Sequence, residues 1–350
     1  MKIKHTFNPR AHARGLTLIE LMISIFLGLL IIGAAITVFT SNRQTYRATE
    51  SIGRIQENAR TAFELMARDI REAAGNACEQ NIPVVNVLNG PTANWYTDFA
   101  GGIRGYDGGA AMQGLATGTA AGQRIAGTDA IELKSSVSNG VTIEDHQPMS
   151  AQFKMNTVDH GLDDGDIAMV CDFNHAAIFQ VTNASPGTND TVVHNSGTGT
   201  PGNARTCLST TGVCDSGSIK TYGFGCRNGE SPCAPEDAWP ATIAKLRATR
   251  WFIGNNPRGG RSLYQGSLQN VSANLSVSNN EIVEGVRDMQ LTYLEIDGTD
   301  YVAANAPPDW SVVSAVRIEL TFEGEDRVGV DGAVLQRQLF HTVALRNRAP

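Results

Sequence analysis

The chain has 350 residues and a formal net charge of −7. This length is enough for one or two domains with a sizeable core. The first 15 residues carry four basic side chains and no acidic one, which leaves −11 for the rest. An acidic body repels a phosphate backbone, so nucleic acid is not an expected partner.

An apolar segment follows this basic start. Residues 16–39 contain a single charged side chain, that of Glu20. A helix of this length spans about 36 Å, enough to cross a bilayer core of roughly 30 Å. A secretory signal peptide would have a shorter apolar run and a small-residue cleavage site, which does not follow Phe39. A plain signal anchor fits the length and the basic flank but leaves Glu20 unexplained, because a carboxylate in a membrane helix costs roughly 2.5–3.5 kcal/mol.

The octapeptide GLTLIELM at residues 15–22 accounts for this carboxylate. It resembles the type III signal of type IV prepilins and pseudopilins. The resemblance implies that a prepilin peptidase cuts on the cytoplasmic face between Gly15 and Leu16, and that the new amine of Leu16 is then methylated. The chain departs from the usual pattern in having Leu in place of Phe after the cut. Its leader of 15 residues is longer than the shortest leaders of that family.

Cutting would create an ammonium group at Leu16, one helical turn from Glu20 and on the same face of the helix. Opposite charges in an apolar medium attract strongly, so each offsets the desolvation of the other. The spacing alone leaves open whether the pair forms within one subunit or between neighbours. The resemblance implies the second arrangement, in which Glu20 aligns each subunit against the amine of the next.

The helix is expected to continue beyond the membrane through residues 40–75, because no Pro occurs between Leu16 and Gly75. Apolar residues recur at three-to-four spacing and predict one buried stripe: Ile52, Ile55, Ala59, Phe63, Met66, Ile70 and Ala74. The remaining face is charged and predicts a solvated surface, which includes Asp69 and the pairs Glu50–Arg54, Glu64–Arg68 and Arg68–Glu72. Gly75 and Asn76 provide a C-terminal stop.

Residues 76–350 predict one extended β domain. The expected strands are residues 130–137, 167–172, 177–182, 249–253, 262–266, 282–283, 289–296, 312–322 and 335–345. Residues 84–128 and 183–245 are expected to be long loops. Between Val316 and Phe322 apolar and polar residues alternate, which is typical of an antiparallel sheet with one buried face. The predicted fold class is α+β, with a long helix packed on a mainly antiparallel domain.

Six cysteines follow the apolar segment, which favours the oxidising side of a membrane and disulfides over free thiols. The spans from Cys207 to Cys214 and from Cys226 to Cys233 each hold six intervening residues, whereas zinc ligands favour two to four. Six cysteines allow 15 connectivities. We expect two local pairs, Cys207–Cys214 and Cys226–Cys233, together with Cys78–Cys171, which would tie the end of the helix to the sheet.

Further segments resemble PilW-type minor pilins of type IV pili. They are residues 41–47, 54–60, 65–71, 165–182, 285–290 and 342–348. The resemblance covers both ends of the chain and islands between them, and it implies a type IV pilin-like fold. The loops at 84–128 and 183–245 lie outside it.

No residue pattern predicts catalysis, a metal site or a cofactor. Asp163, Asp164 and Asp166 surround Gly165, but the twelfth position of a calcium loop starting at Asp163 holds Asn174, so a turn is expected. Asp297-Gly298 predicts a hairpin turn. Trp95, Tyr96, Trp239 and Trp251 are expected to pack in the core.

The sequence therefore predicts a structural minor pilin, with a cleaved leader (1–15), a transmembrane half-helix (16–39), an amphipathic half-helix (40–75) and a β domain (76–350). By resemblance, it would enter the inner membrane with its C-terminal domain in the periplasm and then join the pilus. Its partners would be other minor pilins, the major pilin, the prepilin peptidase and N-methyltransferase, the assembly platform and a tip adhesin. It would support pilus initiation, adhesion and twitching, at or near the tip. The alternatives are a type II secretion pseudopilin, a tip adhesin or binding module, and a membrane-anchored enzyme, for which no reactive cluster is found.

Overall fold

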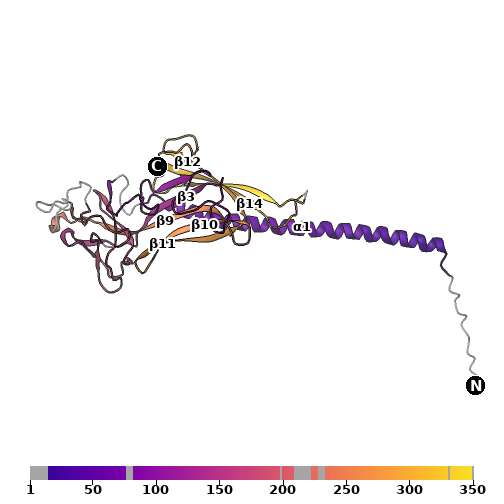
Figure 1. Ribbon diagram of the computed structural model, residues 1–350, viewed down its shortest axis with the longest axis horizontal. Coiled ribbons are helices and arrows are strands. Elements are labelled where there is room, and N and C mark those ends of the chain that lie inside the picture. Colours follow the sequence, from indigo (N-terminus) through magenta and orange to yellow (C-terminus); the bar gives the residue numbers. More distant parts are fainter. Residues whose placement is uncertain are drawn as a thin grey trace, which may run out of the picture. The chain divides into compact units, whose positions relative to one another are not determined.

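The computed structural model describes residues 15–75, 82–197, 199–208, 222–227, 233–329 and 332–348. The chain forms two compact units. The first comprises Met1–Gly53 and Glu325–Leu335, and the second comprises Arg54–Gly324 and Gln336–Pro350. One helix, α1 (Leu18–Glu72), contributes residues to both, and all the strands belong to the second unit (Figure 1). The α+β class is thus confirmed.

Helix α1 is continuous over 55 residues, as the absence of Pro predicts, and it begins two residues later and ends three residues earlier than the expected span of 16–75. Its C-terminal end uses Ala74 in the left-handed conformation, with φ at 58°. The backbone N–H of Ala74 donates to the carbonyl of Lys134 at 2.9 Å, so the helix ends directly on the sheet. This close approach requires Gly102, where a Cβ atom would lie 2.4 Å from the Cα of Ala74.

The buried stripe of α1 in the second unit is confirmed at Ile55, Ala59, Met66 and Ile70, with Ala62, Ala67 and Ala73 beside them. The predicted solvated face is wrong at Asp69, which is 4% exposed. The ion pairs of Glu64 and Glu72 differ from the expected ones, in which both carboxylates pair with Arg68. Glu64 pairs with Arg60 at 2.8 Å, and Glu72 pairs with Arg247 at 3.5 Å.

The largest sheet has eight strands. They are β1 (Val84–Asn86), β2 (Ile103–Tyr106), β3 (Ala130–Val137), β6 (Ile167–Cys171), β7 (Ala176–Gln180), β9 (Thr242–Asn255), β10 (Arg261–Val271) and β11 (Asn274–Glu284). β9 holds this sheet together, because it pairs with β6 through residues 242–245, with β3 through 245–252 and with β10 through 249–255. All its pairings are antiparallel except that of β1 with β7.

A four-stranded antiparallel sheet contains β12 (Val286–Glu295), β13 (Val302–Ala303), β14 (Val313–Glu323) and β15 (Gln336–Ala344), in the order β13-β12-β14-β15. The predicted alternation on β14 is confirmed, since Val316, Ile318, Leu320 and Phe322 are all buried. Phe63 of α1 lies against this sheet, with its ring 6.5 Å from Phe322 and 5.3 Å from His341. The predicted turn at Asp297-Gly298 joins β12 to β13, with Asp297 at a φ of 62°.

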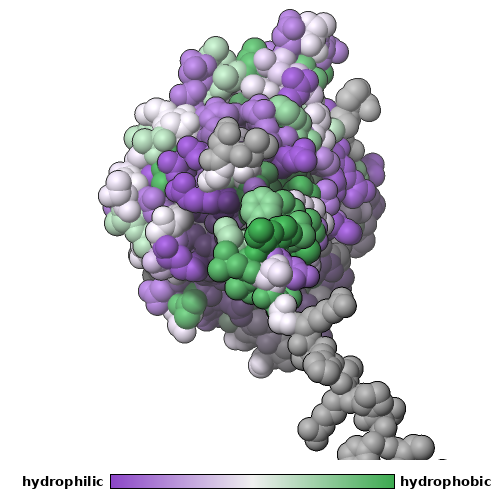
Figure 2. All heavy atoms as spheres, turned by 90° about the vertical axis from the view of Figure 1, so that its right-hand side faces the viewer, coloured by the Kyte–Doolittle hydropathy of each residue, from purple (hydrophilic) through white to green (hydrophobic). Residues whose placement is uncertain are grey.

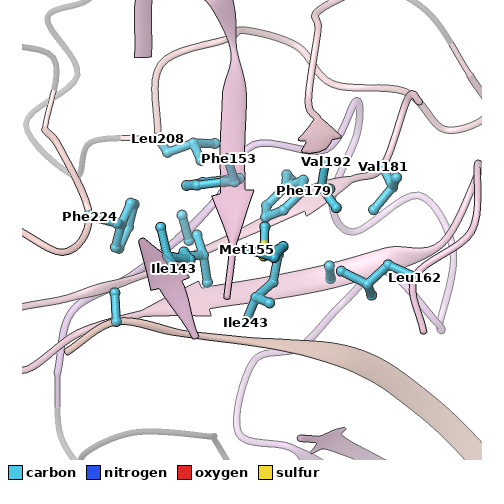
Figure 3. Packing of buried hydrophobic residues seen from close by; sticks show 14 of the residues in the cluster. Ile143, Phe153, Met155, Leu162, Phe179, Val181, Val192, Leu208, Phe224 and Ile243 are labelled. Atoms are coloured by element: carbon cyan, nitrogen blue, oxygen red, sulfur yellow. The ribbon is translucent and has the colours of Figure 1, made fainter. Parts of the chain in front are cut away.

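A three-stranded sheet of β4 (Ile143–Gln147), β5 (Gln152–Met155) and β8 (Thr191–Val193) was not predicted. It covers a hydrophobic cluster in which the side chains of Ile143, Phe153, Phe179, Phe224 and Ile243 converge (Figure 3). The expectation of loops throughout 84–128 and 183–245 is therefore wrong at β1, β2, β8 and the start of β9. Two short 3-10 helices also occur, at Pro148–Ser150 and Pro235–Asp237.

Candidate assembly site on the N-terminal helix

The predicted processing site lies just before α1. Gly15, Leu16 and Thr17 are exposed and outside regular secondary structure, and the leader residues 1–14 are outside the described part of the chain. The position of a Cβ atom on Gly15 would have no described atom within 4 Å. The peptide bond between Gly15 and Leu16 is thus accessible, as a protease requires. The cut and the methylation of Leu16 remain predictions.

Thr17 and Glu20 form a capping box at the start of α1. The backbone N–H of Glu20 donates to Oγ1 of Thr17 at 3.3 Å. In return, the backbone N–H of Thr17 donates to Oε2 of Glu20 at 3.4 Å. These reciprocal contacts satisfy two of the N–H groups that a helix start leaves without partners. The pattern Thr-x-x-Glu at residues 17–20 is the sequence signal of this motif.

The capping box leaves part of the carboxylate available. Both contacts of the Glu20 carboxylate, with the backbone N–H and the hydroxyl of Thr17 at 3.4 Å each, use Oε2. Within the described residues, Oε1 has no hydrogen-bond donor. A carboxylate has about four lone-pair sites, so one Glu20 side chain can close the capping box and accept a further bond from an ammonium group.

The first half of α1 presents apolar side chains on its whole circumference. Leu18, Ile19, Phe26 and Phe39 are each more than 60% exposed. Figure 2 shows the molecule from the side on which α1 starts in Figure 1, and hydrophobic side chains gather near the centre of this view. Within the described residues, α1 alone is long and apolar enough to span a membrane. Such a surface requires lipid or other helices around it.

The hydroxyl groups within this apolar half bond to the helix itself. Ser24 donates to the carbonyl of Glu20 at 2.7 Å, Thr37 to that of Ala34 at 2.8 Å, and Thr40 to that of Ile36 at 2.9 Å. Polar groups that are satisfied in this way enter an apolar environment at a lower cost. The segment is therefore suited to a bilayer or to a bundle of similar helices.

The second half of α1 is held on the sheet by Asp69. This buried carboxylate accepts hydrogen bonds from Nε1 of Trp251 at 3.0 Å and Nε2 of Gln265 at 2.6 Å, and Nη2 of Arg247 lies 3.2 Å away. The sequence did contain a signal for its burial. Asp69 lies three residues after Met66 and four before Ala73, on the apolar stripe.

The disulfide Cys226–Cys233 is confirmed, with the two Cα atoms 5.5 Å apart. Cys171 and Cys207 are also disulfide-bonded. Their predicted partners, Cys78 and Cys214, lie outside the described residues, so these two pairings remain predictions. Cys226 and Ala238 form a backbone bridge, so the disulfide lies in a segment paired with the residues before β9.

The other residues named from the sequence lie in turns or pack against the rest of the fold. The Asp163–Asp166 segment forms the expected turn, and Asp166 pairs with Lys245 at 2.7 Å. The described residues contain no group of three or more His, Cys, Asp and Glu side chains that could hold a metal ion. Trp95 and Trp251 are buried as expected, whereas Tyr96 and Trp239 are partly exposed.

The fold brings together two histidines that lie 48 residues apart in the sequence. His146 and His194 are both buried, with ring centroids 5.5 Å apart. Phe153 stacks on His146 at 4.2 Å and lies 4.8 Å from His194. Burial lowers the pKa of His194 to about 3 and holds the pKa of His146 well below its usual value. Both rings are therefore neutral at physiological pH.

Two family models match the chain. The model for the prokaryotic N-terminal methylation motif matches residues 10–36, and the model for type IV pilus-assembly protein W matches residues 250–347. No curated protein and no solved structure gave a match. The first match covers Gly15, Glu20 and most of the apolar segment, and the second runs from the centre of β9 through β15. Both models describe structural components rather than enzymes. Together with the long apolar helix and the antiparallel β domain, these matches support a PilW-like type IV pilin.

Proposed function

We propose that this minor pilin helps to initiate type IV pilus assembly and remains at or near the pilus tip, where it supports adhesion and twitching motility. The observation that carries the proposal is the start of α1. There, an exposed apolar helix begins with a carboxylate whose Oε1 accepts no hydrogen bond from a described residue, beside an accessible Gly15-Leu16 bond. This arrangement suits a subunit that docks its helix among similar helices.

In the proposed maturation, the peptidase removes residues 1–15 and the amine of Leu16 is methylated, which keeps its charge. The ammonium of a neighbouring subunit then approaches Oε1 of Glu20. In the low-dielectric helix bundle this pair offsets the desolvation of both charges, and a shift along the bundle would leave both unpaired. The pair therefore sets the axial alignment of the subunits.

We place the β domain in the periplasm before assembly. The disulfide-bonded Cys171, Cys207, Cys226 and Cys233 support this orientation, because structural disulfides persist in oxidising compartments. The basic leader would stay in the cytoplasm, in agreement with the distribution of positive charge around membrane helices.

Deletion of the gene tests the function. We expect fewer surface pili and reduced twitching, both restored by the wild-type gene, with normal export of proteins. Unchanged piliation with failed protein secretion would contradict the pilus assignment and favour the alternative of a type II secretion pseudopilin. Mass spectrometry of the mature protein tests the processing step, since a methylated N-terminus at Leu16 is expected.

A further inference from the structure

A cavity of about 540 Å³ lies in the second unit, between the eight-stranded sheet and the chain that leads from β1 to β2. Met169 of β6, Ile178 of β7 and Leu246 of β9 form an apolar wall. Phe99, which is partly buried, belongs to the same hydrophobic cluster and also lines the cavity. This volume lies within the range of about 300–1,000 Å³ that is typical of small-molecule sites, and such sites are mostly apolar with a few polar groups.

Lys134 of β3 is the buried charge that lines this cavity. Its side chain is 4% exposed, and its Nζ lies 3.4 Å from Oε2 of Glu132 and 5.9 Å from the ring centroid of Trp95. An ammonium group has three donors, and the described residues offer it this single, long hydrogen bond. Burial with unused donors is unfavourable, so an acceptor in the cavity would stabilise Lys134.

The neighbouring charges do not fill this role. Oε2 of Glu132 is shared, because it also accepts the hydroxyl of Tyr106 at 2.8 Å. The guanidinium of Arg348 donates to the carbonyls of Gly101, Trp310 and Val313. Asp98 is partly exposed and accepts the backbone N–H of Ala100 at 3.2 Å. Among the described residues that line the cavity, Lys134 is thus the buried cation with spare donors, and burial lowers the pKa of its ammonium group.

We propose that this cavity binds a small amphiphile whose anionic head accepts hydrogen bonds from Lys134 and whose apolar chain packs on Met169, Ile178 and Leu246. The chemistry selects both parts of the ligand. The apolar wall favours a hydrocarbon chain, and the buried ammonium favours a carboxylate or phosphate head over a neutral or cationic one. This inference is independent of the pilus function.

Calorimetric titration of the full chain in lipid nanodiscs tests it, with octanoate as the probe and empty nanodiscs to subtract partitioning into lipid. We expect one octanoate per chain and at least tenfold weaker binding of octanol. Lys134→Met, which removes the ammonium but keeps an unbranched side chain, should weaken octanoate binding at least tenfold. Lys154→Met is the matched control, because Lys154 lies on β5 and pairs with Asp190 at 3.1 Å. It should bind octanoate like the wild type.

A heat equal to that of empty nanodiscs, or equal affinities for the wild type and Lys134→Met, would overturn the proposal.

A second measurement needs no variant. The wild-type protein is acetylated with and without octanoate, and the modified lysines are quantified by mass spectrometry. Octanoate should slow the acetylation of Lys134 and leave that of Lys154 unchanged. Equal rates at Lys134 with and without octanoate would also overturn it, even if Lys134→Met fails to fold.

Discussion

Thr17 and Glu20 bind each other reciprocally across the first turn of α1, each backbone N–H donating to the side chain of the other residue. Glu20 therefore has a structural role in the isolated subunit in addition to the proposed pairing with an amine. The two roles can be separated, because Gln serves as well as Glu in a capping box but carries no charge.

Glu20→Gln is expected to insert in the membrane normally and to enter pili poorly, because it keeps the cap and loses the ionic partner of the amine. Immunoblots of the membrane fraction and of sheared pili measure the two steps. Glu20→Ala should show the same defect in incorporation with insertion intact. Normal incorporation of both variants would refute charge pairing.

Thr17→Ala is the complementary change. It removes the hydroxyl that accepts the N–H of Glu20, at a cost of about 1 kcal/mol typical of a lost N-cap, and leaves the carboxylate in place. We expect incorporation into pili well above that of Glu20→Gln, measured in the same sheared fractions. If Thr17→Ala were as defective as Glu20→Gln, capping rather than charge would be the main role of Glu20.

Asp69→Ala should destabilise the second unit by about 3 kcal/mol, because it leaves the indole N–H of Trp251 and the amide of Gln265 without their buried acceptor. Thermal unfolding of the full chain, followed by circular dichroism, measures the loss. Glu64→Ala on the same helix is the control. It removes an exposed ion pair with Arg60 and should leave the melting temperature unchanged. Equal melting of Asp69→Ala and the wild type would show that Asp69 does not hold the helix on the sheet.

The sequence predicted those parts of the molecule in which a local pattern coincides with burial. The alternation on β14 and the apolar spacing of α1 are such patterns, and the unbroken apolar run with Glu20 indicated the assembly helix. Prediction from the sequence failed where contacts between residues far apart in the chain determine the structure. β4 has the sequence IEDHQ, with a single aliphatic residue, and it exists because it pairs with β5 over the cluster around Phe153. Asp69 lies on the apolar stripe, but Trp251, which binds its buried carboxylate, is 182 residues further on, so no local pattern showed this partner.

The buried histidines predict that stability falls on acidification. The pKa of His194 is about 3 in the folded protein and about 6.5 in an unfolded chain, so below pH 6.5 the unfolded state binds a proton that the folded state does not. Stability is thus fully present above pH 6.5 and falls progressively towards pH 3. Between pH 7 and pH 5, His194 alone should cost about 2 kcal/mol.

His194→Phe should reduce this pH dependence, because the new ring keeps the aromatic contacts with Phe153 and Phe179 and cannot bind a proton. His146, which faces His194 at 5.5 Å, would still titrate, so a smaller slope should remain. Urea unfolding at a series of pH values measures both slopes, and the comparison at pH 7.5 controls for any change in packing. If wild type and His194→Phe lost the same free energy of unfolding between pH 7 and pH 5, the acid sensitivity would have to come from other groups.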